Sequence, residues 1–199
     1  MIILVLGPQG SGKTTQAKLI AKDFNLKHFS TGNALRSVLK NTKHPLYSKV
    51  YKSYINGDLV DDSIVNNLLH NALVSNSKKG IVIDGTPRKM SQLIEIDNTL
   101  KELGKHLDLV IFINTSIRES KKRLIKRAEI ENRPDDTPKS IQHRLNLYHK
   151  NIGPILNEYK KRGLLVKVDG NPSIKEIHKN IVYIIKKHFN DNKNFSRSK

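Results

Sequence analysis

The chain has 199 residues, which is enough for one medium-sized domain with a buried core. It contains no Cys, which excludes a disulfide framework and thiolate metal sites and is typical of a reducing, cytoplasmic environment. The formal charge of +18 favours anionic ligands, but few aromatic residues lie near the basic ones, so we expect small phosphate-bearing molecules and no specific nucleic acid.

The chain opens with an apolar run, Met1 to Leu6, which is too short for a signal peptide or a membrane span and predicts a buried strand. Gly7 to Thr14 then matches the pattern G-x-x-x-x-G-K-[ST], and a helix is predicted from about Lys13 to Phe24. A strand, a glycine-rich loop and a helix in this order form a phosphate-binding loop, because backbone N–H groups and the helix N-terminus point at the phosphates. We assign this loop to residues 7–15, and the residues expected to bind the phosphates of a nucleotide are Gly10, Ser11, Gly12, Lys13, Thr14 and Thr15.

Continuous apolar runs recur at Ile81–Asp84, Leu107–Ile113 and Leu164–Val168, with amphipathic helical stretches between them. They predict an α/β fold of the P-loop NTPase type, in which helices flank a parallel sheet in three layers and ligands bind at the carboxyl ends of the strands. The core is expected at 1–29, 61–125 and 137–189, with Thr137 as an N-cap before Pro138. A polar tail is expected at 190–199.

Two segments do not follow this alternation of strands and helices and are candidates for mobile flaps over a site. Residues 30–60 are predominantly helical without a strong strand, and 126–136 are short, polar and charged. Between them, Asp84 follows a strand and can hold Mg²⁺ through water, with Thr14 as a further candidate ligand, while Arg88 can bind a second phosphate. Arg123 and Arg127 are four residues apart on a predicted helix, and such clustering of like charges points to an anionic ligand.

These segments resemble the adenylate kinase family. The motifs that carry the resemblance, in the order and spacing of that family, are GPQGSGKTTQ from Gly7, STGNALR from Ser30, GDLV from Gly57, DGTPRKMSQ from Asp84 and RPDDTPKSIQHRL from Arg133. Together they cover the chain from residue 1 to about residue 172. The resemblance implies reversible, Mg²⁺-dependent phosphoryl transfer from ATP to AMP, with residues 30–60 as the acceptor-binding insert and 126–136 as a short lid.

The resemblance also implies roles for individual residues. Those implied to act on the transferring phosphoryl group are Lys13, Arg88, Arg123, Arg133 and Arg144, with Asp135 and Asp136 positioning the arginines. Those implied to contact ATP beyond the loop are Arg123, Arg127, Gly170 and Pro172. Those implied to hold AMP are Thr31, Arg36, Gly57, Asp58, Leu59, Val60, Gly85, Arg88, Gln92, Arg133 and Arg144. No structural zinc is expected, and a monomer without membrane association is the simplest assembly.

Three positions depart from the usual family pattern: Asn33 replaces an Asp, Thr86 an aromatic residue and Asp61 a Pro. Thr86 offers less apolar surface to the acceptor base, which would weaken AMP binding or relax its selectivity. The nearest alternative is a UMP/CMP kinase, against which Thr31 and Gln92 argue because a hydroxyl and an amide can pair with the adenine edge. An alternative of another class is a basic nucleic-acid-binding protein with a regulatory nucleotide site, which the charge permits but no stacking motif supports.

Overall fold

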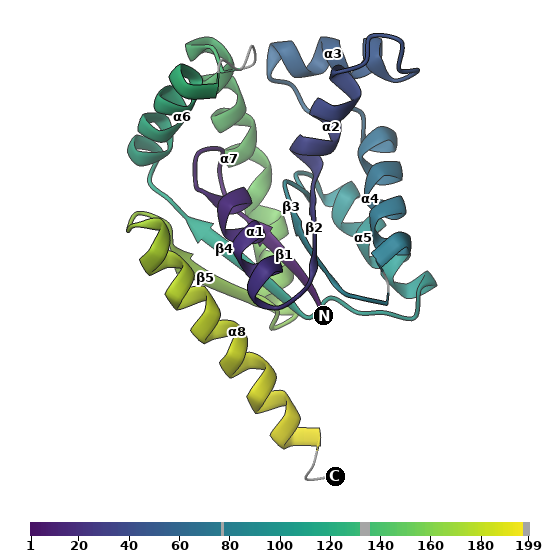
Figure 1. Cartoon of the computed structure of the whole chain (residues 1–199), viewed down its shortest axis with the longest axis vertical. Helices are drawn as coiled ribbons and strands as arrows, with labels where there is room; N and C mark the ends of the chain where they lie inside the picture. The colour runs from purple at the N-terminus through teal and green to yellow at the C-terminus, as the bar shows by residue number, and fades with distance from the viewer. Residues whose placement is uncertain (77, 132–135, 197–199) are drawn as a thin grey trace.

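The computed structural model describes residues 1–76, 78–131 and 136–196. At its centre lies a five-stranded sheet with the strand order β2-β3-β1-β4-β5, in which every neighbouring pair is parallel (Figure 1). The strands are β1 (Ile2–Leu6), β2 (Lys27–Ser30), β3 (Ile81–Asp84), β4 (Leu109–Asn114) and β5 (Leu165–Asp169). The predicted α/β class with a parallel sheet is confirmed.

Helices cover both faces of this sheet and connect its strands. They are α1 (Lys13–Asp23), α2 (Thr31–Leu39), α3 (Tyr47–Asn56), α4 (Asp62–Asn76), α5 (Met90–Glu102), α6 (Ile117–Glu131), α7 (Pro138–Lys161) and α8 (Ile174–Ser196). Helices α4, α5 and α7 pack on one face, and α1 and α8 on the other. None of the helices in the described part of the chain is long and apolar enough to cross a lipid bilayer.

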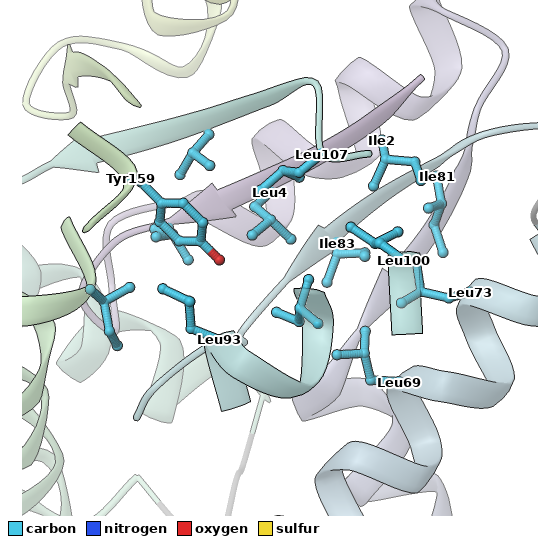
Figure 2. Close-up of a cluster of buried hydrophobic side chains, with 14 of the residues drawn as sticks. Ile2, Leu4, Leu69, Leu73, Ile81, Ile83, Leu93, Leu100, Leu107 and Tyr159 are labelled. Atoms are coloured by element: carbon cyan, nitrogen blue, oxygen red, sulfur yellow. The ribbon is translucent and has the colours of Figure 1, made fainter. Parts of the chain in front are cut away.

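Alternate residues of each strand enter opposite cores, as the pleat of a strand requires. Ile2, Leu4 and Leu6 of β1 join the core under α4, α5 and α7, which also contains the fully buried Tyr159 of α7 (Figure 2). Ile3 and Val5 join the core under α1 and α8. Because both of their faces are buried, β1, β3 and β4 are largely apolar, which is why they could be found as continuous runs.

The acceptor-side insert, formed by α2 and α3, has a small core of its own. The buried apolar residues of this cluster are Leu35, Val38, Val50, Val60, Ile64 and Val65, which come from α2, α3, the loop that follows α3, and the start of α4. In Figure 1 α2 and α3 lie at the upper right, across from the upper ends of α6 and α7. The insert is therefore a packed unit that borrows part of its core from α4.

The N-terminus of α7 has the predicted cap. Thr137 lies in the extended region (φ −76°, ψ 152°), and its Oγ1 accepts a hydrogen bond from Ser140 N at 3.2 Å. Pro138 occupies the first helical position, where its missing N–H costs nothing because that group has no partner inside the helix.

Three boundaries differ from expectation. β2 was not predicted, because Lys27–Ser30 forms an edge strand whose side chains are mostly half-buried or exposed and show no apolar run. Helix α6 continues to Glu131, so residues 126–131 of the predicted lid segment are helical, and 132–135 lie outside the described residues. Helix α8 continues to Ser196, so the predicted polar tail begins as helix.

Candidate active site

The phosphate-binding loop connects β1 to α1 at the carboxyl edge of the sheet. Gly10 and Gly12 have φ of 82° and 83°, the left-handed conformation that glycine adopts without steric cost. Gly12 is the N-cap of α1 and makes no side-chain capping bond. The first N–H groups of α1 therefore have no partner within the helix and face the loop, which makes them donors for an anion.

Gly10 is required for a second reason. A Cβ at this position would lie 2.4 Å from the carbonyl oxygen of Ser120, so the loop packs directly on α6. Ser11 is fully buried, and its Oγ has no hydrogen-bond partner among the described residues. Thr15 lies in the first turn of α1 and is exposed.

Lys13 projects into the loop, where its Nζ donates to Pro8 O at 3.1 Å. Burial lowers the pKa of Lys13 to about 7; Arg88, Arg127 and Arg144 add to this effect, and Asp84 opposes it. The ammonium group therefore lies in a site where nearby negative charge is too small to balance its own positive charge. A bound polyphosphate would supply the missing negative charge.

Asp84 ends β3 and, among the described residues, is the only carboxylate that lines the cavity beside the loop. Its Oδ1 accepts from Thr14 Oγ1 at 2.8 Å and from Ser30 Oγ at 3.3 Å, and its Oδ2 lies 2.7 Å from His28 Nε2. An oxygen donor next to a hydroxyl and next to a phosphate cradle suits Mg²⁺, which keeps several waters and prefers oxygen ligands. These residues therefore fit the cation that was expected here.

Five cationic side chains from separate stretches of the chain line this same cavity. They are Lys13, Arg36, Arg88, Arg127 and Arg144. Burial lowers the pKa of Arg88, Arg144 and Arg36 contribute to the lowering, and Asp84 opposes it. Such crowding of like charge is unfavourable until an anion lies between the groups.

Asp136 holds two of these arginines. Its fully buried side chain accepts from Arg127 Nε at 2.7 Å and from Arg127 Nη2 at 2.8 Å, and it also accepts from Arg144 Nη2. Burial alone would raise the pKa of Asp136, but the hydrogen bonds and charges of Arg127 and Arg144 keep it below its usual value. The carboxylate thus ties the end of α6 to α7 and orients both guanidinium groups.

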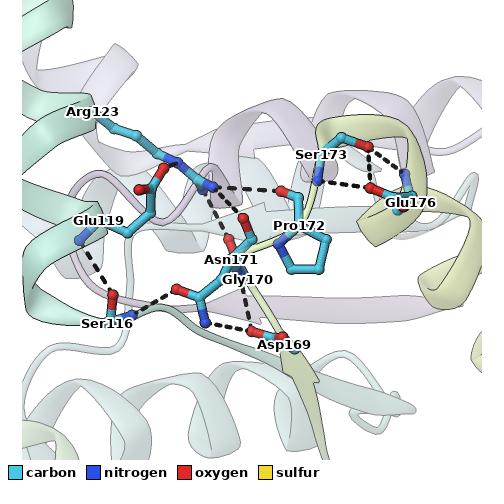
Figure 3. Close-up of polar contacts among 9 residues, drawn as sticks. All are labelled: Ser116, Glu119, Arg123, Asp169, Gly170, Asn171, Pro172, Ser173 and Glu176. Atoms are coloured by element: carbon cyan, nitrogen blue, oxygen red, sulfur yellow. Dashed lines mark hydrogen bonds and ion pairs between the residues drawn. The ribbon is translucent and has the colours of Figure 1, made fainter.

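Arg123 lies in a different place from the other arginines. Its guanidinium pairs with Glu119 Oε1 at 2.7 Å and donates to Gly170 O at 2.9 Å and Asn171 O at 3.1 Å (Figure 3). Figure 3 also shows it reaching Pro172, on the loop between β5 and α8. Arg123 does not line the cavity beside the phosphate loop. Its expected contact with the transferring phosphoryl group stays a prediction. Arg133 and Asp135, which were expected nearby, lie outside the described residues.

A second cavity opens beside the first and is walled by the insert. Arg36, Arg88 and Arg144 line both cavities, so the two adjoin. The other expected acceptor residues that line it are Thr31, Gly57, Asp58, Leu59, Val60, Gly85 and Gln92. The hydroxyl of Thr31 is buried without a partner among the described residues, as a group awaiting a ligand would be.

The insert contacts α7 at the rim of this cavity. Gly57 ends α3 with φ of 75°, and a Cβ there would lie 2.8 Å from Ser140 Oγ and 3.1 Å from Arg144 Cγ. The carboxylate of Asp58 lies 2.7 Å from His143 Nε2. Asn33 Oδ1 accepts from Arg36 Nη2, so the replacement of the usual Asp keeps an acceptor for this arginine and removes only a charge.

Among the lining residues that were not predicted from the sequence, Gln9 and Tyr148 carry buried polar atoms. Gln9 lines both cavities, and its Oε1 is buried with no partner among the described residues. Tyr148 lies beside Lys13 and Arg88 in an adjoining pocket, and its hydroxyl is likewise without a described partner. Gln9 occupies an unrestricted position of the loop pattern, and Tyr148 had the spacing of an ordinary core residue, so neither carried a signal.

Comparison with known proteins agrees with this geometry. A family model described as Adenylate kinase matches residues 5–164. The chain belongs to the adenylate kinase family.

Relatives named Adenylate kinase align with most of this chain. The protein from Micrococcus luteus is 35% identical over 184 residues, covering 92% of this chain and 89% of its own. The protein from Bifidobacterium longum is 39% identical, with 92% and 98% covered, and that from Xylella fastidiosa is 36% identical, with 92% and 97% covered. Family membership therefore extends over both cavities and the elements that form them.

Proposed function

We propose that this chain catalyses the reversible, Mg²⁺-dependent transfer of the γ-phosphoryl group of ATP to AMP, which yields two molecules of ADP and balances the adenine nucleotides. The observation that carries the proposal is the junction of the two cavities. Arg36, Arg88 and Arg144 line both cavities, and Lys13 and Arg127 line the one beside the phosphate loop. Two anionic substrates can meet there end to end.

The chemistry demands positioning and charge neutralisation. An oxygen of the AMP phosphate forms a bond to the γ-phosphorus of ATP as the bond from that phosphorus to the β,γ-bridging oxygen breaks, and ADP leaves. The attacking phosphate oxygen is already ionised near neutral pH, so no side chain has to remove a proton. The protein gains rate by holding the reactants in line and by stabilising charge on the equatorial oxygens.

The ATP phosphates are assigned to the loop. The N–H groups at residues 10–15 and the start of α1 would bind them, with Lys13 on the β- and γ-phosphates. Mg²⁺, held by Asp84 through water and supported by Thr14, would neutralise the phosphate oxygens when bound. Arg127 and Arg144, oriented by their shared Asp136, then face the phosphoryl group during transfer.

The placement of Arg123 suggests a division of roles. Because it contacts the loop containing Gly170 and Pro172, we assign Arg123 and this loop to the nucleoside end of ATP, and Arg127 to the phosphates. The resemblance to the family still supports a place for Arg133 at the transferring group, with Asp135 among the residues that position the arginines. Both residues therefore remain part of the proposal.

The acceptor is assigned to the cavity on the insert side. Arg36 and Arg88 would bind its phosphate, and Thr31 and Gln92 its base, against the backbone of Gly57 to Val60 and Gly85. The insert 30–60 and the short lid 126–136 are proposed to close over the reactants and keep water from the γ-phosphoryl group. A monomer, as the simplest assembly, and a cytoplasmic location are part of the same proposal.

An acceptor assay tests this proposal. Purified protein is supplied with ATP and, in turn, AMP, CMP, UMP or GMP, with and without Mg²⁺, and ADP formation is followed. We expect rapid turnover with AMP that requires Mg²⁺. Faster turnover with CMP or UMP would replace the proposal with a pyrimidine nucleotide kinase, and retention on nucleic acid without any phosphoryl transfer would reject the enzyme altogether.

A further inference from the structure

Tyr148 of α7 carries a buried hydroxyl that the proposed reaction does not use. The oxygen of this hydroxyl is shielded from solvent and has no hydrogen-bond partner among the described residues. Burial raises the pKa of Tyr148, and Arg88 only partly opposes this, so the phenol keeps its hydrogen at neutral pH. A buried hydroxyl without a partner costs free energy, so its presence in a folded protein calls for an explanation.

The position of Tyr148 places it next to the cations assigned to the phosphates. It lies one helical turn after Arg144, and residues four apart share one face of a helix. Tyr148 lines two small pockets that adjoin the two cavities, and Arg88 and Gln9 line both of these pockets with it. Arg144 also lines the first pocket, and Lys13 lines the second.

The side chains around Tyr148 leave its hydrogen without an acceptor. Among the described residues, no carboxylate lines either pocket, and Lys13, Arg88 and Arg144 can only donate. Gln9 has an acceptor oxygen, but that oxygen and the Tyr148 hydroxyl are each unpaired, so they do not bond each other. The apolar residues that complete the walls are Val5, Leu6, Leu59, Pro87, Leu147 and Ile152. An acceptor for this hydroxyl must therefore come from a ligand, and the surrounding cations favour an anionic one.

We propose that the hydroxyl of Tyr148 donates a hydrogen bond to the phosphate of the acceptor nucleotide, beside Arg88 and Arg144. This inference rests on the proposed function, because it adds a binding residue to the same site. The acceptor phosphate is favoured over those of ATP because Gly57 and Leu59, from the wall of the acceptor cavity, line a pocket with Tyr148.

The hydroxyl is suited to this role because it is uncharged. Arg36, Arg88 and Arg144 already crowd positive charge at the acceptor cavity, and another cation would add to their repulsion. A phenol adds a donor without charge, and its shielding from water strengthens the bond. Because the hydroxyl is shielded, the phosphate reaches it only after neighbouring side chains shift, as expected when the insert closes.

Tyr159, later on α7, provides a matched control. Its hydroxyl is also buried without a partner among the described residues, and burial raises its pKa as well. Tyr159 is fully buried in the core under α4, α5 and α7 and lines neither the two cavities nor the two pockets (Figure 2). The two tyrosines share a helix and a chemical group, and they differ in whether cations surround them.

Removal of each hydroxyl tests the inference. Tyr148→Phe keeps the ring and removes only the donor. We expect KM and the dissociation constant for AMP to rise about tenfold, since a hydrogen bond to a charged group is lost. AMP carries its phosphate charge before and during transfer, so kcat should change less than about twofold, as should KM for ATP. Tyr159→Phe should match the wild type in all of these measurements.

Adenosine separates a contact with the phosphate from an effect on the fold. It has the base and ribose of AMP and lacks the phosphate, so Tyr148→Phe should leave its affinity at the wild-type value. Titrations followed by NMR chemical shifts measure both ligands. Equal losses of affinity for AMP and adenosine would show that the variant disturbs the cavity itself, and a rise in KM for ATP alone would place the hydroxyl at the other substrate; either result overturns the inference.

The outcomes also separate this inference from the proposed function. If the wild-type protein does not phosphorylate AMP, the proposed function fails and the inference fails with it. If AMP is a good acceptor and Tyr148→Phe, folded by its thermal transition, binds AMP as the wild type does, the inference alone is overturned.

Discussion

At the scale of single residues, Lys13 is the cation that the loop holds closest to the expected β- and γ-phosphates. Lys13→Met removes the charge and keeps a long apolar side chain in a half-buried position. We expect turnover to fall by roughly 10³-fold or more, as for other cations that stabilise phosphoryl transfer, with little change in the thermal transition. The matched control is Lys18→Met on the exposed face of α1, which should retain wild-type turnover; equal turnover in the two variants would contradict the assignment.

The lowered pKa of Lys13 leads to a second prediction, which concerns the number of protons taken up when ATP binds. Near pH 8 the ligand-free side chain, with its pKa at about 7, is mostly neutral, and a bound polyphosphate raises that pKa because it favours the charged form. ATP binding should therefore take up close to one proton at about pH 8 to 9, where phosphate itself, with a pKa of about 6, is already ionised. Affinity should decrease as the pH rises above 7.

Titration calorimetry in two buffers of different ionisation enthalpy measures this proton uptake. Lys13→Met should show none. Uptake that is absent in the wild type, or that is unchanged in the variant, would show that another group is responsible.

The residues of the site could be predicted where a motif restricts them. Lys13, Asp84, Arg88 and Gln92 were predicted from the sequence, and each lines at least one of the two cavities. The separation of Arg123 from Arg127 could not be predicted, because both lie on one face of α6. They differ because the backbone at 170–172 accepts hydrogen bonds from Arg123. Gln92's orientation was also hidden, since its Nε2 donates to Asp62, which is distant in sequence.

At the scale of elements, α7 carries Arg144, Tyr148 and part of the core, and its start is fixed by Thr137. Thr137→Ala removes the acceptor for Ser140 N and should lower the free energy of unfolding by about 1 kcal/mol. Thr137→Ser keeps the capping oxygen and should recover most of the loss. Denaturant unfolding of the three proteins measures it, and equal loss in both variants would show that the methyl group and not the cap is responsible.

Elements were predictable where burial leaves a pattern. The strands β1, β3 and β4, which are buried on both faces, were found from apolar runs, as was the edge strand β5. Helix α7 was found from its cap and from Pro138 at its first position. β2 escaped because an edge strand with the sequence KHFS has no apolar run, and its position is set by pairing with β3. Asp136 accepts a hydrogen bond from Arg127 of α6, a tertiary contact that no local sequence pattern records.

At the scale of the whole molecule, the charge of +18 should act on the approach of nucleotides. Screening shortens the reach of this field from about 30 Å at 0.01 M salt to about 8 Å at 0.15 M. We expect kcat/KM for ATP to fall several-fold over this range while kcat changes little, because steering affects encounter and not the bound complex. A kcat/KM independent of salt would mean that the surface charge has no part in substrate capture.

The central claim is that a phosphoryl group passes directly between two mononucleotides held end to end. The most direct measurement starts from ATP labelled with ³²P in its γ-phosphate, which is mixed with unlabelled AMP and Mg²⁺. The position of the label is determined early, before the reverse reaction redistributes it among the products. The account predicts that the label appears in the β-phosphate of the ADP formed from AMP, with little inorganic phosphate. Label released mainly as inorganic phosphate, at a rate unaffected by AMP, would contradict it.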